Sequence, residues 1–266
     1  MMGGNVAWLA TGSLARREVV RFLRQPARLI GAIAMPLIFW LLIGAGMGDS
    51  FRPSGISSEG GFLHYFFPGI VVLCVLFSAI YSTISIIEDR DAGFLQSVLV
   101  APVPSWTIVG GKVLGGAILA LGQGGLLLAL APLLGLPVAW WALVSTFAVL
   151  ALIALSLTAL GFVIAWKSES TQGFHAIMNI LLMPMWILSG AFFPSQGAST
   201  VLAWIMAINP LTYGLSLVRH TLGLDEPSVL ERLPSLEMSL GVSVIFLSVM
   251  VVWSCRVVRS RSRINR

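Results

Sequence analysis

Long apolar runs dominate this 266-residue chain and restrict what it can fold into. Hydrophobic residues make up 57% of the chain and charged residues 10%, which is too little charge to cover a soluble domain of this size. A helix needs about 20 apolar residues to cross a hydrocarbon core of about 30 Å, since each residue advances roughly 1.5 Å. The sequence therefore predicts a single-domain, all-α integral membrane protein with six transmembrane helices, over residues 29–47, 65–87, 107–134, 140–166, 174–193 and 236–258.

The basic residues predict how these spans are oriented. An even number of spans places both termini on one side of the membrane. If that side is the cytoplasm, all but three of the 16 Lys and Arg residues lie inside, the exceptions being Arg52, Arg219 and Arg232. This asymmetry is typical of membrane proteins and predicts an N-in, C-in topology. We attribute the net charge of +5 to topology and to anionic lipid head groups, not to nucleic-acid binding.

Segments outside the spans have their own patterns. Residues 1–27 carry an apolar stripe of Ala15, Val19, Phe22 and Leu23 between arginines, which predicts a cytoplasmic helix lying flat at the membrane surface. Residues 259–266 form a basic cytoplasmic tail. The outer loop 194–235 contains two apolar pieces, 201–207 and 211–218, that are each too short to cross a bilayer. We expect them to be extracellular half-helices.

The third span contains the one intramembrane lysine and a pair of spaced glycines. Lys112 lies within two turns of the start of the span, so we expect its side chain to extend to the membrane interface. Gly111 and Gly115 have the spacing that lets two helices approach closely, either within the chain or between two copies.

The sequence argues against catalysis by this chain. Gly111-Lys112 resembles part of a phosphate-binding loop, but Trp106 and Val113 replace the required glycine and hydroxyl residue. No histidine or cysteine has metal-ligand spacing, and the two cysteines lie at depths that disfavour a disulfide. We therefore predict no enzymatic activity, no metal and no cofactor in this chain. The residues concerned are His64, His175, His220, Cys74 and Cys255.

A charged segment after the second span is the strongest candidate for a functional surface. Residues 88–91 carry four consecutive charges, followed by a short amphipathic stretch. Its apolar side is Phe94, Leu95, Val98 and Leu99, its polar side is Asp91, Gln96 and Ser97, and Pro102 and Pro104 end it. This pattern favours a surface helix that contacts a cytoplasmic partner. A solvated exit from the span is the alternative.

This segment resembles the signature of permease subunits of type-2 ATP-binding-cassette (ABC) exporters, a group that exports drugs, antibiotics and polysaccharides. The acidic, glycine-containing, leucine-rich residues 88–95 and the following 99–103 carry the resemblance. Residues 21–26, Pro36, and residues 209–213 ahead of Arg219 are similar to further family motifs. Phe94 and Gln96 depart from the family, in which a threonine and a carboxylate are common at these positions.

The resemblance implies a half-transporter in the bacterial inner membrane. It implies pairing with a second copy, giving a homodimer, and with two cytoplasmic ABC ATPase subunits that use ATP and Mg²⁺. The surface helix is then the coupling helix, held by polar anchors and by apolar burial in a groove of the ATPase. The coupling interface expected from the resemblance comprises Glu88, Asp89, Arg90, Asp91, Gly93, Phe94, Leu95 and Val98.

The cargo is predicted to be an amphiphilic or hydrophobic, drug-like compound moved out of the cytoplasm. An apolar, aromatic path suits such a compound, although its residues fit a bundle core equally well. Export of a lipid-linked glycan or polysaccharide stays open. An ion-coupled secondary transporter is disfavoured because the midplane lacks ionisable residues, and a non-transporting assembly factor is a further alternative. The expected path residues are Phe66, Phe67, Met183, Met185, Trp186, Phe192 and Phe193.

Overall fold

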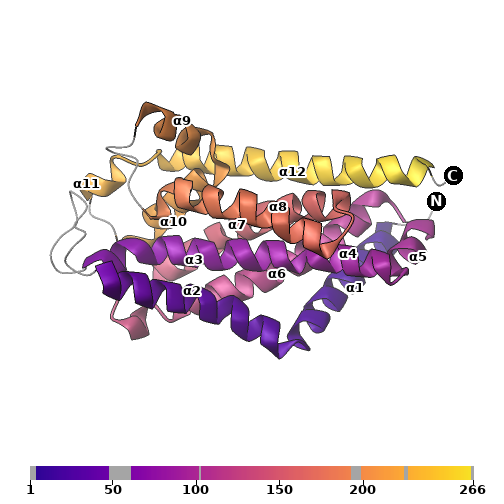
Figure 1. The fold of residues 1–266 in the computed structure, drawn as a ribbon, viewed down its shortest axis with the longest axis horizontal. Helices are drawn as coiled ribbons and strands as arrows, with labels where there is room; N and C mark the ends of the chain where they lie inside the picture. The colour runs from indigo at the N-terminus through magenta and orange to yellow at the C-terminus, as the bar shows by residue number, and fades with distance from the viewer. Residues whose placement is uncertain (1–3, 48–60, 102, 193–198, 225–226, 265–266) are drawn as a thin grey trace.

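The computed structural model describes residues 4–47, 61–101, 103–192, 199–224 and 227–264. Over these ranges the chain consists of helices and contains no strand, which confirms the predicted fold class. The long helices lie side by side, with the start of α1 (Gly4–Leu23), α5 (Phe94–Val100) and the end of α12 (Leu236–Ile264) at one end of the bundle, and α9 (Thr200–Ile208) and α11 (Pro227–Leu230) at the other (Figure 1). We call these the terminal end and the opposite end.

The helices follow the predicted spans closely. In the described ranges, five segments are long and apolar enough to cross a membrane, and they cover the second to the sixth predicted spans; the bent pair Thr200–Ile208 and Pro210–Leu222 would count as a further span. α2 occupies the first predicted span, and residue 193, at the end of the fifth, lies outside the described residues. The helices are α1 (Gly4–Leu23), α2 (Pro26–Met47), α3 (Gly61–Ser82), α4 (Ile84–Asp91), α5 (Phe94–Val100), α6 (Ser105–Ala129), α7 (Trp140–Lys167), α8 (Thr171–Trp186), α9 (Thr200–Ile208), α10 (Pro210–Leu222), α11 (Pro227–Leu230) and α12 (Leu236–Ile264).

α3 is the central helix of the bundle. It packs against α2, α6, α7 and α10, and almost all of its side chains between Phe66 and Ile80 are inaccessible to solvent. The predicted second span breaks at Thr83, where one continuous helix was expected. The hydroxyls of Ser82 and Thr83 donate to the carbonyls of Ala79 and Ile80, both at 2.6 Å, and this local bonding is known to bend helices.

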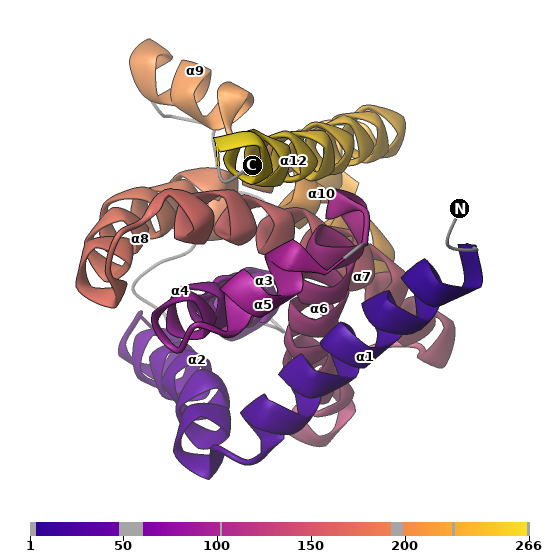
Figure 2. The ribbon, with the colours of Figure 1, turned by 90° about the vertical axis from the view of Figure 1, so that its right-hand side faces the viewer.

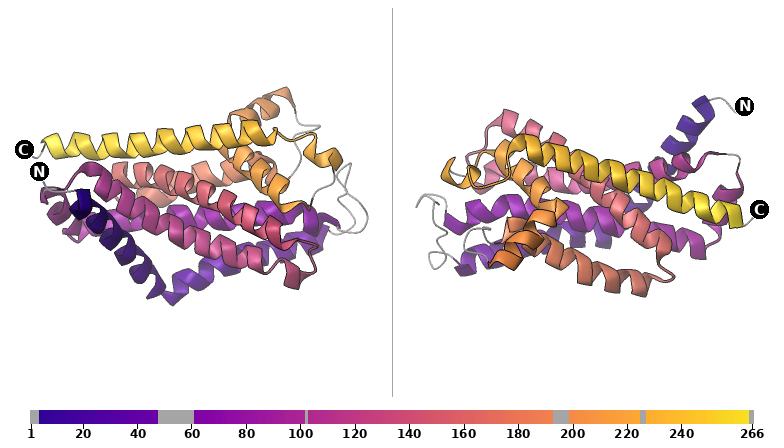
Figure 3. Two further views of the ribbon diagram at one scale, coloured as in Figure 1. Left: turned by 180° about the vertical axis from the view of Figure 1, so that it is seen from behind. Right: turned by 90° about the horizontal axis from the view of Figure 1, so that it is seen from above.

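α12 lies on the outside of the bundle, along α7 and α10, in both views of Figure 3. The two apolar pieces of the outer loop are separate helices, as predicted: α9 and α10 meet at a bend of 80°. Asn209 makes this corner because its side chain accepts from the Leu211 amide at 3.0 Å and donates to the Met185 carbonyl at 2.6 Å. Pro210 then starts α10 without a backbone donor to satisfy.

α1 crosses obliquely beside α6 at the terminal end (Figure 2) and packs directly on it. Of the expected apolar stripe, Ala15 and Phe22 are buried and Val19 is half-buried, whereas Leu23 is 56% exposed. The polar residues Thr11 and Glu18 are buried as well, because a neighbouring helix covers α1. The position of α1 at the membrane surface stays a prediction.

Glycines of α6 make this contact possible. A Cβ on Gly115 would lie 2.7 Å from the Glu18 Cβ and 3.0 Å from the Ala15 carbonyl oxygen. Gly111 likewise faces Leu14 of α1. The spaced glycines thus serve packing within the chain, which was one of the two interpretations of the sequence.

We predict that Gly115→Ala lowers the free energy of unfolding by about 1–3 kcal/mol, because the added methyl group overpacks the contact between α1 and α6. Thermal unfolding in detergent measures this. Gly122→Ala is the matched control in the same helix, since nothing lies within 4 Å of a Cβ there. Equal melting temperatures for the two variants would contradict the contact.

Candidate functional site

Asp89 of α4 is bound by two arginines of α1 at the terminal end. Its carboxylate accepts two hydrogen bonds from Arg17, both at 2.8 Å, and one from Arg21 at 2.9 Å. The bidentate geometry makes the Arg17 pair a strong, directional contact. The hydrogen bonds to Asp89 raise the pKa of the Arg17 guanidinium, so Arg17 remains charged at physiological pH.

Lys112 of α6 extends the same network into the bundle. Its Nζ donates to Glu18 Oε1 at 2.6 Å, to Ser85 Oγ at 3.2 Å and to Asp89. The side chain is 4% exposed, so the prediction that it extends to the membrane interface is wrong. A buried ammonium is tolerated here because two carboxylates neutralise and bond it.

Arg21 also binds Glu88 at 2.5 Å, which completes a network with three positive and three negative side chains. Opposite charges are equal in number, which limits the cost of burying them. The network connects three helices that are far apart in sequence. We call it the charge cluster: Arg17, Glu18 and Arg21 of α1, Glu88 and Asp89 of α4, and Lys112 of α6.

Arg90 makes a separate connection. Its guanidinium donates to the Trp166 carbonyl at 3.4 Å and to the Ser168 carbonyl, which ties α4 to the turn between α7 and α8. The predicted polar anchors Glu88, Asp89 and Arg90 therefore bind within this chain. Asp89 is only 1% exposed, so in this conformation it binds residues of its own chain, and its contact with a partner stays a prediction.

α5 follows directly after the charge cluster. Gly93 turns the chain with φ of 75°, a conformation that glycine adopts without strain. The Arg17 guanidinium lies 3.7 Å from the centre of the Phe94 ring, and Leu95 is buried. The apolar side of α5, including Val98, thus packs largely on its own bundle, and the burial of Leu95 in a partner stays a prediction. The exposed face of α5 comprises Gln96, Ser97 and Val100, and Asp91 at the end of α4 is exposed as well.

Most of the predicted path residues belong to the core. Phe66, Phe67 and Trp186 are at most 1% exposed, and the Trp186 indole donates to the Gly69 carbonyl at 2.8 Å. Phe192 packs edge-on against Phe66. Met185 is half-buried against the core, and Phe193 lies outside the described residues. These positions fit a bundle core, which the sequence allowed equally, and the path stays a prediction; of the described residues in the set, Met183 lines the cavity described next.

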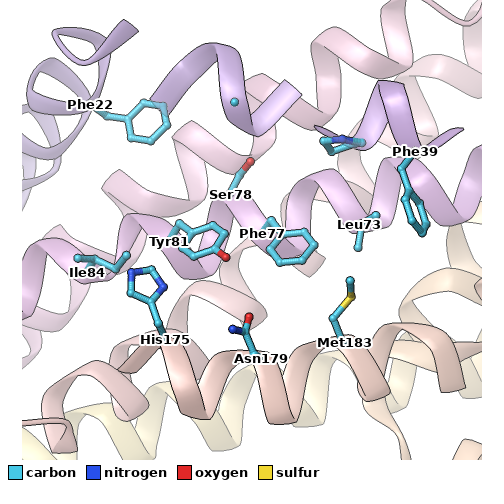
Figure 4. A pocket seen from close by; sticks show the side chains of 12 residues that line it. Phe22, Phe39, Leu73, Phe77, Ser78, Tyr81, Ile84, His175, Asn179 and Met183 are labelled. Carbon is cyan, nitrogen blue, oxygen red and sulfur yellow. The ribbon is translucent and has the colours of Figure 1, made fainter. Parts of the chain in front are cut away.

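A cavity of about 530 Å³ lies between α2, α3 and α8 (Figure 4). The sequence interpretation missed it, although His175, Asn179 and Met183 recur every four residues on α8 and so share one face. Two polar side chains, His175 and Asn179, on one face of an apolar span were the signal in the sequence that could have indicated this cavity. The cavity is lined by Phe22, Gly31, Pro36, Phe39, Leu73, Phe77, Ser78, Tyr81, Ile84, His175, Asn179 and Met183.

Comparison with known proteins gives a family match for this chain. Residues 10–222 match the ABC-2 type transporter family. The chain is 28% identical over 241 residues to a putative transport permease, ycf38, of Cyanophora paradoxa, covering 88% of this chain and 82% of that protein. It is 26% identical over 262 residues to nodulation protein J of Rhizobium leguminosarum bv. viciae, covering 97% and 96%. It is also 26% identical over 259 residues to the inner membrane transport permease YadH of Escherichia coli K12, covering 93% and 94%.

We predict that Asp89→Asn destabilises the protein by roughly 3 kcal/mol, because it leaves Lys112 and two arginines without their shared counter-ion. The figure is at the low end for buried pairs, since Arg17 and Arg21 are about one-third exposed and water screens them. Asp91→Asn, the same change two residues away at an exposed position, is the control and should leave the melting temperature unchanged. Equal effects of the two substitutions on the melting temperature would show that the charge cluster makes no specific contribution to stability.

Proposed function

The chain belongs to the ABC-2 type transporter family, and on that premise we propose that it is the membrane-spanning permease subunit of an ATP-driven exporter. It is a multi-span permease, and its similarity to an inner membrane transport permease places it in the bacterial inner membrane. The family implies an ABC ATPase as partner. We assign ATP and Mg²⁺ to that separate subunit, with no catalytic residue in this chain.

The ATPase contact is proposed at the exposed face of α5, on the cytoplasmic side. The charge cluster is the observation that carries this assignment. It binds α4 to both α1 and α6 immediately behind α5, and a displacement of α5 is therefore passed to a membrane helix through buried ion pairs. Transport proteins commonly respond in this way, by movement of packed elements as rigid bodies. A loosely attached α5 would not transmit force.

A homodimer is the proposed assembly, with two permeases and two ATPases. The family resemblance supports it, because one chain supplies six predicted spans, half of the number expected for a complete transporter.

The cargo is proposed to be an amphiphilic or hydrophobic compound carried out of the cytoplasm. The cavity between α2, α3 and α8 supports this class, since its volume falls within the range of small-molecule pockets and apolar side chains form most of its wall. A lipid-linked glycan or polysaccharide is the second candidate, because the exporter group that residues 88–103 resemble includes polysaccharide exporters.

We predict that Val100→Glu abolishes stimulation of the partner ATPase by the permease. Val100 is 84% exposed on α5, so the charge disrupts an apolar contact with the ATPase but no contact inside the chain. The measurement is ATP hydrolysis by the co-purified complex in lipid nanodiscs.

The matched control is Leu133→Glu. Leu133 is 82% exposed at the opposite end of the bundle, where no ATPase is expected. This variant should retain stimulation. Normal stimulation in Val100→Glu, or failure of any ATPase to co-purify with the wild-type chain, would overturn the proposal.

A further inference from the structure

We propose that the cavity between α2, α3 and α8 binds a neutral amphiphile in one orientation, with its hydrogen-bonding head toward the terminal end and its apolar part toward the opposite end. The proposal rests on the proposed function for its role in transport, but not for binding itself. Of the residues expected to line the path, it retains Met183, and it names the chemistry of the ligand.

Polar groups are gathered in one part of the cavity. Tyr81 of α3 and His175 of α8 face each other with ring centres 5.7 Å apart, and Ser78 and Asn179 follow one turn further along the same two helices (Figure 4). These four side chains provide hydrogen-bond donors and acceptors from both walls. They can therefore hold a hydroxyl, carbonyl or similar head group.

Ser78 is fixed from behind by a second polar residue. Its hydroxyl donates to the Gln123 Oε1 of α6, and both residues are at most 3% exposed. Among the described residues the Gln123 Nε2 has no hydrogen-bond partner. A buried carboxamide that is only partly satisfied is costly in the middle of a span. Its position behind the cavity wall gives it a role in orienting Ser78, whose oxygen can still accept a bond from a ligand.

The other part of the cavity is apolar. Phe39, Leu73 and Met183 line it at the end farthest from His175 (Figure 4). Methionine adapts its shape to different apolar groups, which suits a hydrocarbon or ring system of variable outline. The polarity thus changes along the length of the cavity, and this gradient sets the orientation of an amphiphile.

The lining also determines which head groups are excluded. None of the described residues that line the cavity is Asp, Glu, Lys or Arg. An anionic or cationic head would lose its hydration and find no counter-ion among these described residues, which is unfavourable in surroundings of low polarity. A neutral head loses less and recovers hydrogen bonds. The cavity is accessible from the side, because Asn179 is exposed and Met183 is 38% exposed.

Binding to the full-length permease in lipid nanodiscs, without any ATPase, tests the proposal. The probes are pyrene-labelled dodecanol, its sulfate ester and the trimethylammonium analogue, which share one apolar body and differ in head charge. Empty nanodiscs correct for partition into lipid. We expect the alcohol to bind at least tenfold more tightly than either charged probe.

Variants locate the site. Asn179→Leu should weaken binding of the alcohol by about threefold to tenfold, the loss expected for one neutral hydrogen bond. Tyr81→Phe, which removes a single hydroxyl, should act in the same direction. Gln172→Leu is the matched control: it removes a carboxamide from an exposed position of α8 outside the cavity and should leave binding unchanged.

Charged probes that bind as tightly as the alcohol would overturn the assignment of a neutral head. Equal binding by Asn179→Leu and Gln172→Leu would overturn the assignment of the site. Either failure is distinguishable from a failure of the exporter proposal, which is measured separately by stimulation of the partner ATPase.

Discussion

The structure depends on the burial of opposite charges at the terminal end of the bundle. An ammonium or carboxylate taken out of water alone is strongly destabilising, so Lys112 and Asp89 can be buried only where each finds the other and where Arg17 and Glu18 complete the set. These residues come from three helices, α1, α4 and α6. The position of α1 on α6 is thereby fixed, and so is the direction in which α4 leaves the central helix.

Small residues let this electrostatic arrangement form. Gly115 brings α1 close enough to α6 for Glu18 to reach Lys112, and Gly116 and Gly161 pack against Ser82 and Thr83 at the break between α3 and α4. The break is therefore held tightly despite the interrupted helix. Glu88 and Asp89 of the charge cluster lie on α4 beyond the break, and Ser78 and Tyr81 of the cavity lie on α3 just before it. One continuous piece of chain thus connects the proposed ATPase contact with the proposed ligand site.

Hydropathy predicts the spans because the cost of exposing polar backbone and side chains to lipid acts on every residue of a helix. The corner at Asn209 and Pro210 is predicted for a local reason, since both residues act on the adjacent turn. The two carboxylates that bind Lys112 could not be predicted, because Glu18 lies 94 residues and Asp89 lies 23 residues away from it along the chain. The core position of Trp186 was also beyond prediction, as aromatic side chains suit a core and a binding path equally well. Spacing alone does not separate these two outcomes.

The central claim is that the charge cluster makes α1 and α4–α5 move as one body with the membrane helix α6. Electron-electron distance measurements on spin labels at Arg16 of α1 and Gln96 of α5, both exposed, test it most directly when the complex with its ATPase is taken from the nucleotide-free to the ATP-bound state. The free cysteines Cys74 and Cys255 are first replaced by serine. The claim predicts an unchanged distance distribution between the two labels in the two states, and a broadened one in Asp89→Asn. A shift of several ångströms in the otherwise unmodified protein on ATP binding would contradict it.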